Sequence, residues 1–149
     1  MSKVSIRNKK ANFQYEILDK YVAGIQLTGT EIKSLRDSKA SIGEAYVYLN
    51  SGEVFVKNMY IAPYENASYN NHDERRVRKL LLNKVEILKL EKKLKIQGHT
   101  IVPLHLFVNA NGLAKIEIGL ARGKKLYDKR EDLKQKDAKR SMERHIKNK

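Results

Sequence analysis

The chain has 149 residues, 41% of them hydrophobic, which is enough for one folded domain with an apolar core. It contains no cysteine, so disulfides and thiolate metal sites are excluded, and no stretch has the pattern of a secretory signal or of a membrane span. Lys and Arg outnumber Asp and Glu by 31 to 17, giving a net charge of +14. Positive charge of this size favours a polyanionic partner, most often a nucleic acid, because neutralised phosphates release their counterions.

The first strand is predicted over residues 14–27. Tyr15 and Ile17 alternate with polar neighbours, and the apolar residues from Tyr21 onward keep the same period of two. Gly24 lies inside this run, which indicates a bend or a bulge of the kind that small barrels use to turn a corner.

A short helix is predicted directly after this strand. Thr28 and Glu31 have the spacing of a capping box, in which the Thr hydroxyl accepts from a backbone N–H and the Glu side chain reaches back. Ile32 and Leu35 give the helix one apolar stripe, whereas Lys33 points elsewhere. The helix should pack on the core through that stripe.

The middle of the chain predicts a hairpin followed by a polar loop. Residues 45–49 and 53–61 are strand-like and are joined by a turn at residues 50–52, and residues 62–74 are too polar to be buried. Most tyrosines on strands are expected in the core, while exposed ones could stack on unpaired bases. The tyrosines considered for stacking are Tyr15, Tyr46, Tyr48, Tyr60, Tyr64 and Tyr69.

Residues 75–97 predict the longest helix. Leu80, Ile87 and Leu90 follow a 3.6-residue period, and Gly98 fits just beyond the C-terminus. A basic cluster lies where the preceding loop would meet this helix, an arrangement suited to phosphate contacts. Its members are Arg75, Arg76, Arg78 and Lys79.

Residues 100–108 and 113–121 predict two more strands around a tight turn at residues 109–112. Pro103 indicates that the first of them has an unpaired edge or a bulge. Short strands, antiparallel hairpins and two helices together predict a mainly β fold: a small antiparallel β-barrel of the oligonucleotide-binding type with flanking helices.

The composition changes at Arg122. Residues 1–121 are expected to form the RNA-binding barrel core, and residues 122–149 a basic tail with 12 Lys or Arg against 5 Asp or Glu. The tail has too few large apolar residues to offset an ordering entropy of about 1–2 kcal/mol per residue. It should be disordered alone and become helical on a partner. Tyr127, which lies among lysines, is a candidate for stacking on a base.

Catalysis and metal binding are not indicated. Among the histidines only His99 and His105 are near in sequence, and along one strand they would lie about 20 Å apart, too far to share a metal. The motifs of metalloproteases, nucleophile elbows, phosphate loops and dinucleotide sites do not occur. We expect no enzyme activity, no metal and no cofactor. A structural binder of ribosomal RNA and a small basic nuclease stay open as alternatives.

Four stretches together resemble a known family. They are residues 8–11 (NKKA), 23–36 (AGIQLTGTEIKSLR), 78–82 (RKLLL) and 123–130 (GKKLYDKR). Each is weak alone, but in combination they resemble the SmpB family, the SsrA-binding proteins of bacteria, over nearly the whole chain.

The resemblance implies a cytoplasmic, non-enzymatic factor of trans-translation. Such proteins have an oligonucleotide-binding-type barrel and bind the tRNA-like domain of transfer-messenger RNA around its elbow. They bring that RNA to stalled ribosomes, with elongation factor Tu as an indirect partner through the charged RNA. The tail enters the empty decoding site and mRNA channel of the small subunit and becomes helical there. The protein is expected to act as a monomer, one copy per RNA, without a membrane.

The resemblance also implies site residues. Places on or behind the RNA-binding face of the family correspond to Asn8, Tyr15, Leu81, Asn83 and Lys115. The first-helix motif corresponds to Glu31, Lys33 and Arg36, and the basic junction to Arg76, Arg78 and Lys79. The ribosome-binding tail motif corresponds to Gly123, Lys124, Lys125, Tyr127, Asp128, Lys129 and Arg130.

Two positions depart from the family pattern. Val22 stands where the family usually has an acid before the Ala-Gly pair, so an RNA contact assigned to that acid does not carry over. Glu74 replaces a common Pro in the basic-junction motif, which loosens the loop and adds negative charge.

Overall fold

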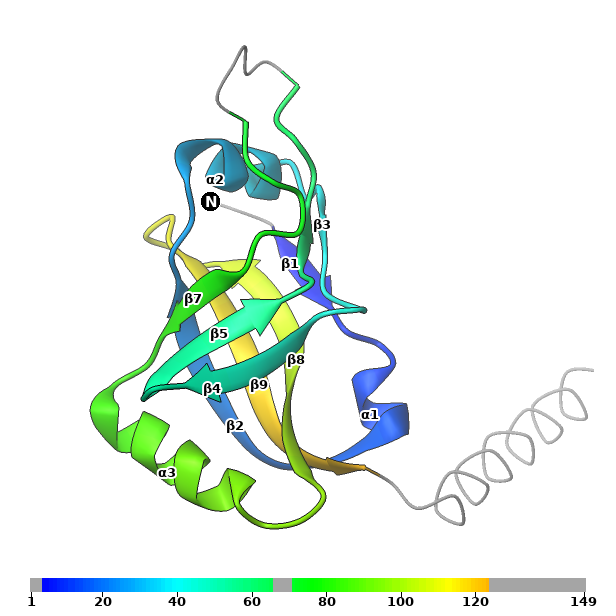
Figure 1. The fold of residues 1–149 in the computed structure, drawn as a ribbon. Coiled ribbons are helices and arrows are strands. Elements are labelled where there is room, and N and C mark those ends of the chain that lie inside the picture. Colours follow the sequence, from blue (N-terminus) through cyan, green and yellow to red (C-terminus); the bar gives the residue numbers. More distant parts are fainter. Residues whose placement is uncertain (1–3, 66–70, 124–149) are drawn as a thin grey trace, which may run out of the picture.

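The computed structural model describes residues 4–65 and 71–123, and these form an antiparallel β-barrel with helices around it (Figure 1). In chain order the elements are β1 (Ser5–Arg7), α1 (Ala11–Gln14), β2 (Tyr15–Ile25), α2 (Gly29–Arg36), β3 (Ala40–Ser41), β4 (Tyr46–Asn50), β5 (Glu53–Lys57), β6 (Tyr60–Ile61), β7 (Arg78–Leu81), α3 (Lys84–Leu94), β8 (His99–Val108) and β9 (Ala114–Gly123).

Seven strands of the described chain form one sheet in the order β1-β8-β4-β5-β7-β2-β9. Pairing of β8 with β9 closes six of them into a ring, with β1 added at an edge of β8, while β3 and β6 form a separate two-stranded ribbon. The ring is weakest between β4 and β8, where Val47 and Ile101 are the one registered pair among the described residues. The predicted mainly β barrel with flanking helices is confirmed.

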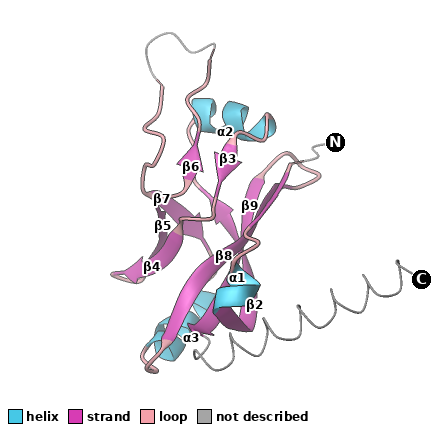
Figure 2. Ribbon diagram, turned by 90° about the vertical axis from the view of Figure 1, so that its right-hand side faces the viewer, coloured by secondary structure: helices cyan, strands magenta, loops and turns pink. Residues whose placement is uncertain are grey.

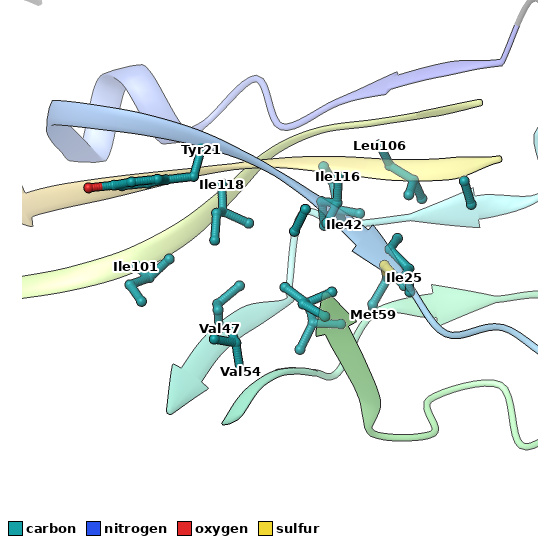
Figure 3. Close-up of a cluster of buried hydrophobic side chains, with 14 of the residues drawn as sticks. Tyr21, Ile25, Ile42, Val47, Val54, Met59, Ile101, Leu106, Ile116 and Ile118 are labelled. Carbon is teal, nitrogen blue, oxygen red and sulfur yellow. The ribbon is translucent and has the colours of Figure 1, made fainter. Parts of the chain in front are cut away.

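Alternation along the strands fills the barrel with aliphatic side chains (Figure 3). On β9, Ile116, Ile118 and Leu120 point inward and are almost completely buried. On β2, Ala23 and Ile25 do the same. Because successive side chains of a strand alternate, the residues between these point outward and are available for other work.

The longer helices lie at opposite ends of the barrel (Figure 1). α2 begins with the predicted capping box: the Thr28 side chain accepts from the Glu31 N–H, and the Glu31 side chain accepts from the Thr28 N–H. α3 packs on the core through Leu90, which is fully buried, with Ile87 beside it. The short α1 lies against the outside of the barrel, where Ala11 packs with residues of β8 and β9 (Figure 2).

The prediction of one helix over residues 75–97 is wrong in its first half. Residues 78–81 form strand β7, which pairs with β5 and β2, and α3 begins only after Asn83. The Asn83 side chain accepts from the Glu86 N–H, a second capping box that fixes the helix start. The stretch from Arg75 onward therefore does not form the basic loop–helix junction that was predicted.

The strand pairing tests three further expectations. Gly24 is paired regularly, and the irregularity of β2 lies between Ile17 and Asp19 instead. The expected bulge near Pro103 is confirmed, because the β8–β9 register shifts just after it. β9 continues through Gly123, so the barrel extends two residues beyond the predicted boundary.

Burial of the tyrosines also differs from the expectation for strand positions. Tyr46 on β4 is 47% exposed, and Tyr15, Tyr48 and Tyr60 are only half-buried. Tyr21 is the tyrosine that joins the core among the described residues.

Candidate nucleic-acid interface

A groove runs along the outside of the barrel between α2, β2, β7 and the β8–β9 turn. It has a volume of about 400 Å³, and its walls combine apolar and cationic side chains. Arg36 comes from α2, Leu81 from β7 and Lys115 from β9. The resemblance assigned Leu81 and Lys115 to the RNA-binding face and Arg36 to the first-helix motif, and the fold brings all three to one place.

The sheet register explains why they meet. Gly24 of β2 is paired with Leu81 on one side and with Lys115 on the other, so the three form one row on the outer face. A Cβ at Gly24 would lie 3.4 Å from the Leu81 Cβ and 3.8 Å from the Lys115 Nζ. Because Gly24 has no side chain, the groove is deeper at this position, and the exposed Leu81 forms its apolar wall.

The first-helix motif divides between the surface and the interior. Lys33 is exposed, and its Nζ lies 5.4 Å from the centre of the Tyr64 ring. Glu31 is fully buried, where it accepts hydrogen bonds from Arg76 (2.6 Å) and from the Nε of Arg78. Glu31 therefore has no surface for RNA and instead joins α2 to the start of β7.

Arg78 requires the clearest correction to the predicted phosphate cluster. Its side chain is 0% exposed, and besides the Glu31 carboxylate it donates to the backbone carbonyls of Met59 (2.6 Å) and Glu74 (3.3 Å). A cation so enclosed cannot reach a phosphate. Its physical role is to neutralise Glu31 and to satisfy the Met59 carbonyl before β6 and the Glu74 carbonyl in the loop between β6 and β7.

Hydrogen bonds set the ionisation of Glu31. Burial alone would raise the pKa of its carboxyl, but the hydrogen bonds from Arg76, from the Thr28 N–H and from Arg78 outweigh burial and lower the pKa. Glu31 is therefore a carboxylate at neutral pH, and the capping box and the ion pairs depend on that charge.

Two other predicted residues, Asn8 and Tyr15, are held by contacts within the protein. The Asn8 side chain donates to the Pro103 carbonyl (2.9 Å) at the bulge of β8, and Tyr15 packs on the small cluster under α1. Arg7 and Lys20 line a second hollow beside Asn8, with a volume of about 300 Å³. Sequence reasoning missed both cations. Their outward alternation on β1 and β2 was the signal available.

Lys79 and Asn83 lie outside the groove. Lys79 is paired in register with Phe55 of β5, and its Nζ lies 3.2 Å from the Glu53 carboxylate. Asn83 caps α3. Val22, which replaces the usual acid of the family, is 51% exposed. It pairs in register with Glu117 of β9, so an acidic residue is still present beside this position.

The tail motif is described only at its first residue. Gly123 pairs with Tyr15 in the last register position of β9 and has no positive φ, so the glycine is not used there for a left-handed turn. Lys124, Lys125, Tyr127, Asp128, Lys129 and Arg130 lie outside the described residues. Arg122, counted with the tail, belongs to β9 and forms an ion pair with Glu16.

Within the described ranges, no three His, Asp or Glu side chains are grouped closely enough to hold a metal ion. In the same part of the chain, no helix has both the length and the apolar character needed to cross a membrane.

Comparison with known proteins decides the family. The family model for the SmpB protein matches residues 5–148. The chain belongs to the SmpB family. The predicted resemblance is thus confirmed.

Individual SmpB relatives agree over almost the full length. The chain is 58% identical to the SsrA-binding protein of Phocaeicola vulgatus, covering 97% of this chain and 96% of the relative. It is 51% identical to the SsrA-binding protein of Geobacillus thermodenitrificans, covering 95% and 91%. A solved SmpB chain described as "tmRNA-SmpB: a journey to the center of the bacterial ribosome" is 48% identical, with a TM-score of 0.69 over 83% of this chain and 86% of that chain.

Proposed function

We propose that this protein binds the tRNA-like domain of transfer-messenger RNA and delivers it to stalled ribosomes in trans-translation. The observation that carries the proposal is the convergence of Arg36, Leu81 and Lys115 in one groove. Support comes from relatives named SsrA-binding protein and from the solved chain described with tmRNA and the ribosome. In this role the protein acts by binding alone, as one copy per RNA, with elongation factor Tu engaged through the charged RNA.

The groove suits a folded RNA better than an extended strand. Arg36 and Lys115 offer charge for backbone phosphates, whereas the exposed Leu81 and the low floor at Gly24 offer a shape for a protruding loop. Asn8 and Tyr15 would then act from behind this face, because both are occupied by contacts within the protein.

The tail is proposed to read the ribosome. β9 ends at Gly123, and the 26 residues that follow are strongly basic. In this proposal Lys124, Lys125, Lys129 and Arg130 contact ribosomal RNA phosphates in the empty decoding site and mRNA channel, while Tyr127 stacks on an exposed base. The entropy lost when such a segment folds on binding lowers its affinity, but a segment that folds only on binding can enter a narrow channel.

The proposal is tested by binding the tRNA-like domain and an ordinary tRNA over a salt titration. We expect tighter binding of the tRNA-like domain at every salt concentration, because the groove recognises shape in addition to charge. Equal affinities with equal salt slopes would mean that the chain is a general polycation for RNA, and the proposal would fail.

A further inference from the structure

A cluster of three aromatic rings lies on the outside of β4 and β5. The Tyr46 and Tyr48 rings have centroids 6.3 Å apart, and the Tyr48 ring stacks on Phe55 with centroids 5.6 Å apart and planes inclined by 28°. Val47 and Val56, which alternate with them, are buried in the core, so the rings point outward. We call Tyr46, Tyr48 and Phe55 the aromatic platform. It shares no residue with the groove.

Packing between strands accounts for two of the rings but not for the third. Tyr48 and Phe55 are a directly opposed cross-strand pair, and such pairs stabilise a hairpin. Tyr46 lies at the end of this row of rings, inclined by 43° to its one ring neighbour among the described residues, and leaves 47% of its surface exposed. An exposed ring at the end of such a row can pack against another flat ring, such as a base.

The positive charge around the platform indicates that the ring packing on Tyr46 belongs to a polyanion. Lys57 is opposite Tyr46 in the register, is exposed, and has no ion pair in the described part of the chain. Lys79 is opposite Phe55 on the other side, but its charge is already paired with the Glu53 carboxylate, so Lys57 is the cation that carries the argument. Aromatic rings beside ammonium groups are the arrangement that binds single-stranded nucleic acid, where the ring takes a base and the cation takes a phosphate. The centre of a protein interface, by contrast, is depleted in lysine.

We propose that the aromatic platform binds unpaired nucleotides of RNA, with a base stacked on Tyr46 and a phosphate at Lys57. This goes beyond the proposed function, since the groove for the folded RNA uses other residues. One protein would then hold a folded RNA on one face and an unpaired strand on another.

The test uses the full-length protein and a fluorescein-labelled ten-nucleotide oligouridine, with the tRNA-like domain present at saturation. Tyr46→Ala should weaken oligouridine binding roughly tenfold, and Tyr46→Phe should leave it within about twofold, because stacking needs the ring and not the hydroxyl. Both variants should bind the tRNA-like domain as the unchanged protein does. Ultraviolet crosslinking of an oligomer containing 4-thiouridine should modify peptides from residues 46–57.

Three results would overturn the inference. Unchanged oligouridine binding by Tyr46→Ala would assign the exposed ring to something other than RNA, a protein partner included. Equal losses for both RNAs would remove the separation of the two surfaces. Crosslinks confined to residues 124–149 would assign the unpaired strand to the tail. Failure of the unchanged protein to prefer the tRNA-like domain would count against the proposed function instead.

Discussion

The Glu31 carboxylate of α2 accepts a hydrogen bond from the Arg78 guanidinium of β7, and both side chains are completely buried. The two residues are 47 positions apart in the sequence. Their contact holds the helix that forms one wall of the groove against the strand that forms another. The position of Arg36 relative to Leu81 thus depends on a buried ion pair.

Removing one partner of this pair should be costly. Arg78→Met leaves the Glu31 carboxylate buried with less compensation, and the expected loss in free energy of unfolding is about 3–5 kcal/mol. Urea denaturation measures it. The double variant Arg78→Met/Glu31→Leu should recover part of the loss, because no buried charge then stays uncompensated. A double variant less stable than Arg78→Met would show that the ion pair is not the reason for the cost.

Acid should weaken the same contact. Since the pKa of Glu31 is lower in the folded protein than in the unfolded chain, the group contributes stability that is fully present above the unfolded carboxyl value, near pH 4.3. That contribution is lost as pH falls through the folded pKa. Thermal denaturation between pH 6 and pH 3 should show a steeper decline for the unchanged protein than for Glu31→Gln. Parallel curves would argue against a lowered pKa.

Much of this protein can be read from its sequence where the signals are local. The Thr28–Glu31 capping box, the turns and the β8 bulge near Pro103 all follow from residues a few positions apart. The groove could be anticipated only through the family, because the pairing of Gly24 with both Leu81 and Lys115 is set by strand register.

Arg78 shows why the rest could not be predicted. In the run RKLL, two charged residues followed by two leucines are typical of an exposed helix start, and the helical spacing of Leu80 with Ile87 supports that interpretation. In the structure the run alternates, with Arg78 and Leu80 inward and Lys79 partly exposed. The buried charge of Arg78 is tolerated because the Glu31 carboxylate of α2 accepts a hydrogen bond from it. This is a tertiary contact, so no local sequence pattern predicts it.

A third prediction concerns close packing on the outer face. A Cβ at Gly119 would lie 2.9 Å from the Leu104 Cδ1 and 3.1 Å from the Ile17 Cγ2. Gly119→Ala should therefore lower the free energy of unfolding by about 1–3 kcal/mol. Gly43→Ala is the matched control, since nothing lies within 4 Å of its Cβ and its φ is not positive. Equal stability of the two variants would contradict the packing argument.

The tail prediction separates RNA binding from rescue. A chain ending at Gly123 keeps the whole of β9, and we expect it to bind the tRNA-like domain but not to support tagging of nascent chains on stalled ribosomes. Tyr127→Ala should lower tagging far more than RNA affinity, whereas Tyr127→Phe should retain most of it. Comparable losses of tagging and of RNA affinity in Tyr127→Ala would refute a stacking role on the ribosome.

The groove itself is tested most directly by comparing two charge removals. Lys115→Gln removes an ammonium from the groove, and Lys89→Gln removes an equal charge from an exposed position on α3. For the tRNA-like domain we expect the first variant to bind about tenfold more weakly, with a salt slope reduced by about 1, and the second to bind within about twofold of the unchanged protein. Equal affinities of the two variants would contradict the assignment of the RNA to this groove.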